Sequence, residues 1–264
     1  HQKQLFTVCK KPNPKLVLYI APTGTGKTLS PIGLSEKFKV IFVCAARHVG
    51  LALAKSAISC EKKVAFAFGC KDPGDIRLHY FAAKEYVKNR RSGSIFKVDN
   101  SIGDRVEIMI CDLESYIPAM HYMRSFNDVS NLIMYWDEPT ITMDYQHHEL
   151  HDTIQRNWQN NIIPNVILSS ATLPKQHEIC GTIAHFRSKF SDSIIENIVS
   201  HDCKKTIPII NKDGYMALPH MMFPNFKDLA ESIEHCKENK TLLRYMDLKV
   251  ILRFISYMTE KKLI

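Results

Sequence analysis

The sequence predicts an α/β fold in which a mostly parallel central sheet is flanked by helices. Three features of its 264 residues indicate this fold. Short apolar runs alternate with helical segments, which is typical of parallel strands joined by crossover helices. Several runs are apolar throughout, as expected for strands that are covered on both faces. The first run leads into a loop rich in Gly and Thr, and a segment that can be helical follows.

That loop, Ala21-Pro22-Thr23-Gly24-Thr25-Gly26-Lys27-Thr28, follows the apolar run 15–20 and is predicted to bind phosphate. Glycine permits the tight turn that points backbone N–H groups at an anion, and the next helix N-terminus adds partial positive charge. We expect Thr23 to Thr28 to hold a nucleotide, with Lys27 at the terminal phosphates and the Thr28 hydroxyl on Mg²⁺. A chance match is the alternative, which the flanking strand and helix disfavour.

Strands and helices are expected to alternate after the loop. Helical patterns cover residues 29–38, 47–58, 113–123 and 147–158, and strand patterns cover 40–45, 64–69, 106–111, 132–136 and 165–168. Residues 77–87 also fit a helix, whereas 1–14 read as polar and irregular and 88–94 as an exposed basic loop.

The regular alternation of predicted strands and helices ends near residue 190. Two strands, 193–199 and 206–210, are followed by turn-rich sequence and by helical patterns over 226–236 and 242–257. We therefore expect residues 1–190 to form the ATP-binding domain and residues 191–264 to form a C-terminal α+β extension or the start of a second domain.

Composition narrows the class of protein. Lys and Arg number 35 against 27 Asp and Glu, a net charge of +8 that favours a polyanionic partner such as nucleic acid. No apolar run approaches the roughly 18 residues of a membrane span, and the N-terminal sequence lacks the apolar stretch of a signal peptide. Eight cysteines form no C-x-x-C pair. These features predict a soluble intracellular protein with no membrane partner.

Asp137 and Glu138 directly follow the apolar run 132–136. Parallel sheets bind ligands at the carboxyl ends of their strands, so we expect both carboxylates beside the phosphate loop. There Asp137 can hold Mg²⁺ through water. Glu138 can orient or deprotonate the water that attacks the terminal phosphate in ATP hydrolysis, and Lys27 is the third expected catalytic residue. Either carboxylate alone would be an ordinary surface charge, but a pair ending a buried strand favours catalysis.

Taken together, these motifs resemble those of DEAD/DEAH-like superfamily 2 helicases. Ala21 stands where the general loop pattern has Gly, as in the variant that this superfamily uses, and Asp137-Glu138-Pro139-Thr140 matches the DEAD/DEAH tetrapeptide in its first two residues. Ser170-Ala171-Thr172 resembles motif III, so the Ser170 and Thr172 hydroxyls would couple the ATP site to nucleic acid. The resemblance implies the first RecA-like P-loop NTPase domain of an ATP- and Mg²⁺-dependent helicase or translocase, with DNA or RNA as partner.

Two further positions take a role only from this resemblance. Arg47, in Ala45-Ala46-Arg47-His48-Val49-Gly50, stands at the place of motif Ia and would contact the nucleic-acid backbone. The alternative is an Arg that merely flanks a helix, because phosphate contact requires only a cation within reach. Gln2 or Gln4, upstream of the phosphate loop, would serve as the adenine-reading glutamine; a solvated terminal Gln is the alternative.

ABC ATPases are the competing family, since they also carry Asp-Glu-Pro-Thr. They require a Ser-Gly-Gly-Gln-type signature before that strand, and residues 124–131 contain no glycine. Ser170-Ala171-Thr172 at the end of the following strand decides for superfamily 2. The departures at motif Ia and at Pro139-Thr140 indicate a divergent member, for example one from a large DNA virus.

The arginine-rich motif VI of the family does not occur in the chain. The resemblance covers about residues 15–175, which corresponds to one of the two RecA-like domains between which helicases hydrolyse ATP. We therefore expect weak ATPase activity alone and a second RecA-like domain as partner, in cis or in trans. A helicase-derived nucleic-acid or protein-binding module that binds ATP without hydrolysing it is the other alternative.

Overall fold

The computed structural model describes residues 1–22, 24–89, 92–142, 145–200, 209–239 and 248–262. The chain divides into two units, His1–His201 and Asp202–Ile264.

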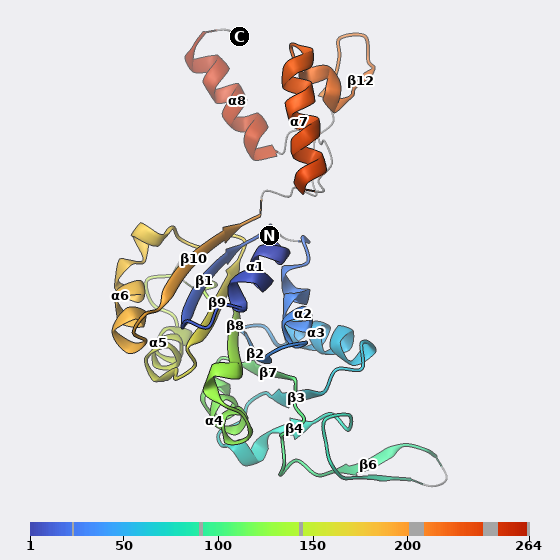
Figure 1. The fold of residues 1–264 in the computed structure, drawn as a ribbon, viewed down its shortest axis with the longest axis vertical. Helices are drawn as coiled ribbons and strands as arrows, with labels where there is room; N and C mark the ends of the chain where they lie inside the picture. Colours follow the sequence, from blue (N-terminus) through green and yellow to red (C-terminus); the bar gives the residue numbers. More distant parts are fainter. Residues whose placement is uncertain (23, 90–91, 143–144, 201–208, 240–247, 263–264) are drawn as a thin grey trace. The chain divides into compact units, whose positions relative to one another are not determined.

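Eight strands form the central sheet of unit 1, in the order β10-β1-β9-β8-β2-β7-β3-β4 (Figure 1). They are β1 (Lys15–Ile20), β2 (Lys39–Cys44), β3 (Val64–Ala67), β4 (Arg77–Leu78), β7 (Ile108–Asp112), β8 (Leu132–Asp137), β9 (Asn165–Ser170) and β10 (Ile194–Val199). Neighbouring strands run parallel except for β4, which lies antiparallel to β3. The predicted mostly parallel α/β sheet is confirmed.

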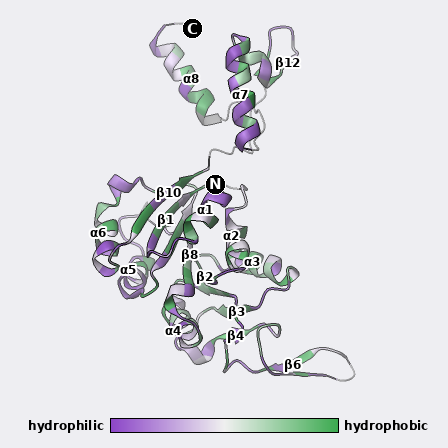
Figure 2. Cartoon of the chain, in the orientation of Figure 1, coloured by the Kyte–Doolittle hydropathy of each residue, from purple (hydrophilic) through white to green (hydrophobic). Residues whose placement is uncertain are grey.

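Helices cover both faces of the sheet and make unit 1 a three-layer structure. One face carries α1 (Gln2–Cys9), α2 (Ser30–Leu34) and α3 (Arg47–Ser59); the other carries α4 (Tyr116–Phe126), α5 (Leu150–Asn160) and α6 (Cys180–Lys189). Successive side chains of a strand point to opposite faces, so Val17 and Tyr19 of β1 enter one core and Leu16 and Leu18 enter the other. Figure 2 shows both hydrophilic and hydrophobic segments along α5 and α6, as helices on an apolar sheet require.

An excursion leaves the sheet between β4 and β7. Its strands β5 (Tyr86–Lys88) and β6 (Ile95–Val98) form a separate antiparallel pair, and Figure 1 shows this hairpin projecting beyond β4. The helix expected over 77–87 was therefore wrong: Leu78 pairs with Ala65 as part of β4, and Tyr86 already belongs to β5. The expected basic loop 88–94 forms the end of the hairpin, with Arg90 and Arg91 outside the described residues.

The expectation of an irregular N-terminal segment was also wrong. Residues 2–9 form α1, and Leu5, Val8 and Cys9 are buried against the sheet. Their spacing of three and four residues is a helical stripe. The stripe is short, and the polar residues around it obscured it in the sequence.

The two units meet at 201/202, beyond the expected boundary at 190/191. The difference arises because β10 pairs with β1 along its whole length, from Lys15↔Ile194 to Ile20↔Val199, and so belongs to the main sheet. The pattern predicted a strand there but carried no information about its neighbour.

Unit 2 contains the antiparallel pair β11 (Ile209–Ile210) and β12 (Met216–Ala217), followed by helices α7 (Phe226–Asn239) and α8 (Leu248–Glu260). Residues 206–208 and 242–247 of the expected strand and helix lie outside the described residues. Across the described ranges of the chain, no helix has the length and apolar character needed to cross a membrane.

Candidate active site

The phosphate loop connects β1 to the 3₁₀ helix Lys27–Leu29, at the carboxyl edge of the parallel sheet. Gly24 and Gly26 have φ angles of 83° and 86°, in the left-handed region that favours glycine. Gln2 Nε2, at the start of α1, donates a hydrogen bond to Gly26 O at 3.3 Å and so ties the N-terminal helix to the loop. Of the predicted loop residues, Thr23 lies outside the described residues, and Thr25 Oγ1 donates to Pro22 O at 2.8 Å.

Lys27 is held from both its main chain and its side chain. Only 6% of the residue is exposed, and Tyr135 Oη on β8 donates to Lys27 O at 2.8 Å. The same hydroxyl lies 3.0 Å from Ser169 Oγ on β9. Strands β8 and β9 therefore fix the position of the loop relative to the sheet.

The Lys27 ammonium reaches the carboxylate that follows β8. Lys27 Nζ lies 2.5 Å from Glu138 Oε1, and Ser170 Oγ donates to Glu138 Oε2 at 2.5 Å. Ser170 Oγ also accepts a hydrogen bond from Thr172 N at 3.1 Å. Three segments singled out in the sequence, the phosphate loop, Asp137-Glu138 and Ser170-Ala171-Thr172, thus meet through one carboxylate.

Glu138 has a backbone conformation that is unusual for its residue type. Its φ angle is 50°, and its N–H donates to Ser169 O at 2.7 Å. A non-glycine residue in the left-handed region is strained, and it persists only where the surrounding structure holds it there. Such residues cluster at functional sites. Here the hydrogen bond to β9 holds the turn and directs the carboxylate toward Lys27.

Asp137 ends β8 in a buried position, with 5% of the residue exposed. Burial raises its pKa to about 6, although the charge of Lys27 opposes the shift. Asp137 Oδ1 has no hydrogen-bond partner in the part of the chain that the structure describes. A buried carboxylate oxygen without a partner favours a cation beside it.

The donor atoms at this place suit Mg²⁺. The Asp137 carboxylate and the half-buried Thr28 hydroxyl offer oxygen ligands, which magnesium prefers. Among the described residues, no group of three or more His, Cys, Asp or Glu side chains could hold a metal ion. Magnesium takes few protein ligands and completes its shell with phosphate and water.

Arg47 lies apart from this cluster, at the start of α3. Its side chain is 60% exposed, with Nη2 at 3.9 Å from Asp112 Oδ2 and the guanidinium 5.1 Å from the centre of the Phe68 ring. Asp112 also accepts hydrogen bonds from the Gly69 and Ser115 N–H groups, at 2.8 and 2.9 Å. The carboxylate therefore braces the loop after β3 and orients Arg47.

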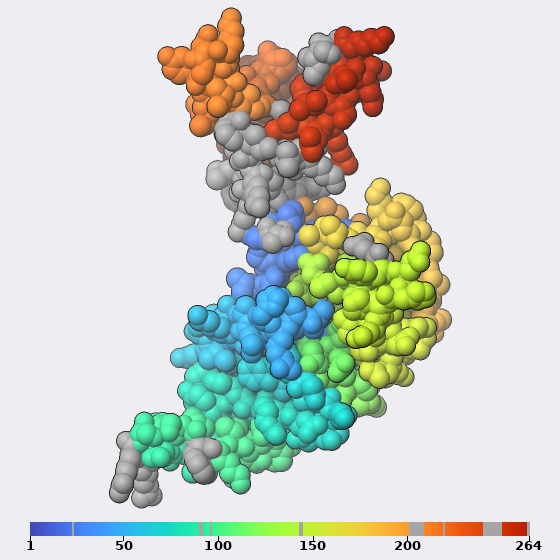
Figure 3. Space-filling view, turned by 180° about the vertical axis from the view of Figure 1, so that it is seen from behind, coloured from blue at the N-terminus to red at the C-terminus, as the bar shows by residue number. Residues whose placement is uncertain are grey.

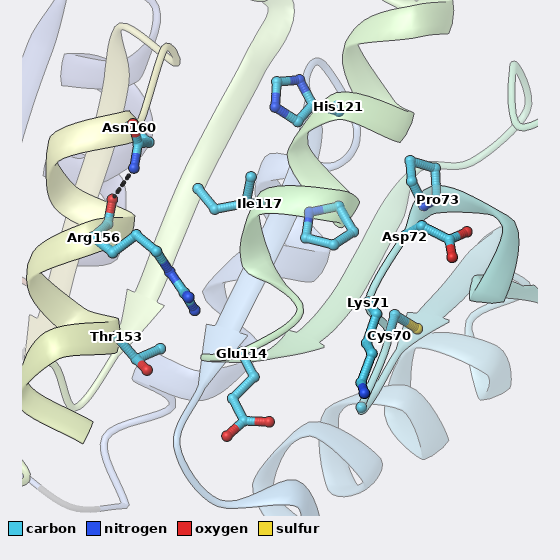
Figure 4. Close-up of a pocket in the computed structure, with 12 residues that line it drawn as sticks. Cys70, Lys71, Asp72, Pro73, Glu114, Ile117, His121, Thr153, Arg156 and Asn160 are labelled. Carbon is cyan, nitrogen blue, oxygen red and sulfur yellow. Dashed lines mark hydrogen bonds between the residues drawn. The ribbon is translucent and has the colours of Figure 1, made fainter. Parts of the chain in front are cut away.

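A pocket of about 610 Å³ adjoins this loop. Figure 4 shows the Arg156 side chain directed from α5 toward the pocket, with Glu114 and Lys71 on other parts of its wall. Its complete lining is Gly69, Cys70, Lys71, Asp72, Pro73, Glu114, Ile117, Pro118, His121, Thr153, Arg156 and Asn160. Sequence reasoning missed this pocket, because its walls come from three separated segments and neither Arg156 nor Lys71 belongs to a motif.

No family model matches the sequence, and no curated protein is significantly similar to it. Among solved structures, the Hef helicase domain of Pyrococcus furiosus is 18% identical with a TM-score of 0.43, over 76% of this chain and 38% of its own. The DEAD-box helicase Mss116 bound to ssRNA and UDP-BeF is 14% identical with a TM-score of 0.47, over 76% of this chain and 40% of its own.

A DEAD box protein from the hyperthermophile Methanococcus jannaschii is 15% identical with a TM-score of 0.46, over 87% of this chain and 61% of its own. The chain therefore spans between 38 and 61% of the length of these three similar structures. The fold of unit 1 is established by the order and direction of its own strands.

Proposed function

We propose that unit 1 binds and hydrolyses ATP with Mg²⁺, as the first RecA-like domain of a superfamily 2 helicase or translocase. The observation that carries the proposal is the contact network of Lys27, Glu138 and Ser170. Three motifs predicted separately meet in it at the carboxyl edge of one sheet, which is where α/β proteins bind their ligands.

In this proposal the phosphate loop receives the triphosphate through its backbone N–H groups, and Lys27 pairs with the terminal phosphates. Thr28 and Asp137 would hold Mg²⁺, which neutralises the charge of the phosphates when bound. An arriving phosphate competes with Glu138 for Lys27. The released Glu138 carboxylate, still held by Ser170, is then free to orient or deprotonate the attacking water.

Nucleic acid is the proposed macromolecular partner, and two observations support it. The chain carries a net charge of +8, and exposed Arg47 lies beside a loop that lines the 610 Å³ pocket, whose wall carries Lys71 and Arg156 together with Asp72 and Glu114. Cations in such positions suit a phosphate backbone. A second RecA-like domain, in cis or in trans, would supply the arginines that this proposal requires at the transition state.

ATP turnover, with and without single-stranded DNA or RNA, tests the proposal. Lys27→Ala and Glu138→Gln should each lower the rate by on the order of 100-fold or more, because each removes a group that acts on the phosphates or on the water. Glu36→Gln, which removes a carboxylate paired with Lys62 at the surface, is the matched control and should keep the wild-type rate.

Equal rates in the wild type, Lys27→Ala and Glu138→Gln would show that the hydrolysis arises elsewhere and would refute the proposal. Tight ATP binding without turnover, even with nucleic acid and a second RecA-like domain present, would instead identify a binding module.

A further inference from the structure

We infer that the β5–β6 hairpin is a binding surface for single-stranded nucleic acid, formed by the exposed side chains of Tyr86, Lys88 and Lys97. The inference rests on the proposed function, which supplies the nucleic acid. It adds a second contact region, outside the main sheet, that none of the sequence motifs accounts for.

Positive charge is concentrated in the excursion that carries the hairpin. Residues 77–105 hold seven of the 35 cations of the chain and three of its 27 carboxylates, a net charge of +4 that is half of the total of +8. The cations are Arg77, Lys84, Lys88, Arg90, Arg91, Lys97 and Arg105. This density fits a polyanion and opposes a protein interface, since lysine is depleted from the cores of such interfaces.

The base of the excursion is fixed to the body of unit 1. Ala83 and Val106 are buried in the core that α4 shares. Leu78 N donates to Asn100 Oδ1 at 2.7 Å, and Tyr122 Oη on α4 donates to Asn100 O at 2.9 Å. A surface carried on a fixed base loses less conformational entropy on binding than a free loop does.

The side chains of the hairpin, in contrast, are exposed. All three residues of β5 are exposed, with Tyr86 at 46% and Val87 at 55%. The hairpin pairs Tyr86 with Val98 and Val87 with Lys97, and its register shifts between Val87 and Lys88, so Tyr86 and Lys97 lie on opposite faces of a narrow two-stranded ribbon. The Tyr86 ring packs edge-on against Tyr80, with 5.6 Å between the ring centres, and this contact orients an exposed aromatic ring on the hairpin.

The two hairpin lysines, Lys88 and Lys97, differ from Lys84 in their ion pairing. Lys84, at the base, pairs with Asp104 at 2.9 Å. Within the described ranges, neither Lys88 nor Lys97 forms an ion pair with a carboxylate. Their ammonium groups can therefore bind phosphate without first breaking an internal contact.

A hairpin that carries both an exposed aromatic ring and lysines without an ion pair to the described residues favours a single strand over a duplex. Each base of a single strand offers a face on which Tyr86 can stack, while the lysines bind the backbone. In a duplex the base faces are covered by their neighbours, so only the phosphate contacts would remain.

The hairpin is also close in the chain to the 610 Å³ pocket. Pro73, which lines the pocket, precedes β4 by a few residues, and α4 contributes His121 to the pocket and Tyr122 to the base of the excursion. Figure 3 shows the described hairpin atoms at the margin of unit 1, at the lower left of that view.

Fluorescence anisotropy with labelled single-stranded and duplex oligonucleotides, over a range of salt, tests the inference on the whole chain. Lys88→Ala/Lys97→Ala should weaken binding to both probes and reduce the salt slope for the single strand by about 1.4, from two lost phosphate contacts. Tyr86→Ala should weaken single-strand binding by about tenfold and leave duplex binding unchanged, while Tyr86→Phe keeps wild-type affinity. Lys10→Ala/Lys55→Ala, two exposed lysines elsewhere, is the charge-matched control.

If the wild type binds neither probe, the proposed partner and this inference both fail. If the wild type binds but the hairpin variants match the Lys10→Ala/Lys55→Ala control, only the hairpin inference is overturned. A lysine effect without a Tyr86→Ala effect, with inorganic polyphosphate competing as well as the oligonucleotide, would show a general anion surface and would also overturn it.

Discussion

Lys27 Nζ and Glu138 Oε1 lie 2.5 Å apart although 111 residues separate them in the chain. The lysine side chain is 7% exposed and the glutamate side chain 37% exposed, so the glutamate is the member of the pair that solvent reaches. In the proposed function, a phosphate that enters the loop replaces this carboxylate as the partner of Lys27.

Glu138→Gln should therefore raise the affinity for nucleotide while it abolishes hydrolysis. The neutral amide competes less well for Lys27, and an ion pair that is partly exposed is worth up to about 1 kcal/mol, so the gain should be severalfold. Titration with a fluorescent ATP analogue measures it. Glu36→Gln should leave the affinity unchanged, and a fall in the affinity of Glu138→Gln would contradict the competition.

Tyr135→Phe should destabilise unit 1 by about 1 to 2 kcal/mol, because it removes a buried hydroxyl that binds Lys27 O and lies against Ser169 Oγ. It should also weaken nucleotide binding, since the loop loses its tie to β8. Urea denaturation and the same nucleotide titration measure the two effects. Tyr116→Phe, which removes a buried hydroxyl bonded to Asn161 Oδ1 at 2.6 Å, should lower stability without changing nucleotide affinity.

Asp137→Asn should change how the stability of the free protein depends on pH. Burial raises the pKa of Asp137 from its ordinary value of 3.8 to about 6, so between these values the folded chain holds a proton that the unfolded chain has released. The contribution of Asp137 to the free energy of unfolding is therefore largest below pH 3.8 and decreases as the pH rises toward 6. Asn does not titrate, so relative to the wild type the variant should gain on the order of 2 kcal/mol between pH 4 and 7.

Urea denaturation without nucleotide or Mg²⁺ at a series of pH values measures this difference. Asp128 provides a control of opposite sign, because hydrogen bonds from Ser130 hold its pKa below its ordinary value. Relative to the wild type, Asp128→Asn should lose stability as the pH rises toward 3.8 from below, and the difference should then stay nearly constant between pH 4 and 7. Parallel pH profiles for the wild type and Asp137→Asn would show that Asp137 titrates normally.

Gly103→Ala should destabilise the base of the hairpin excursion. A Cβ at this position would lie 2.3 Å from Cε1 of Tyr122, a buried ring whose hydroxyl holds Asn100. Moving the ring should cost about 2 kcal/mol, measured by thermal or urea unfolding. Gly181→Ala in α6, where nothing lies within 4 Å of the added Cβ, should be neutral or slightly stabilising, and similar losses in both variants would contradict this packing.

Local hydrophobic patterns in the sequence were sufficient to predict most strands of the central sheet. The runs around 132–136 and 165–168 are apolar throughout and became the central strands β8 and β9. Predictions from hydrophobic spacing were wrong where an element was short and only two or three apolar residues defined it. The helical stripe of α1 consists of Leu5, Val8 and Cys9, and the segment 77–87 kept a helical spacing although Leu78 pairs with Ala65 in the sheet.

The sequence by itself determined which residues gather at the candidate site. The carboxyl ends of parallel strands lie at one edge of a sheet, so Lys27 after β1, Glu138 after β8 and Ser170 at the end of β9 were expected at the same edge. Only the tertiary structure decided that Glu138 contacts Lys27 and Ser170 together, that β10 lies beside β1, and that Arg156 and Lys71 share a pocket. The physical reason is that side-chain spacing reports the local environment of a strand or helix, whereas contacts between distant residues depend on strand order and on the conformation of single turns, such as the left-handed one at Glu138.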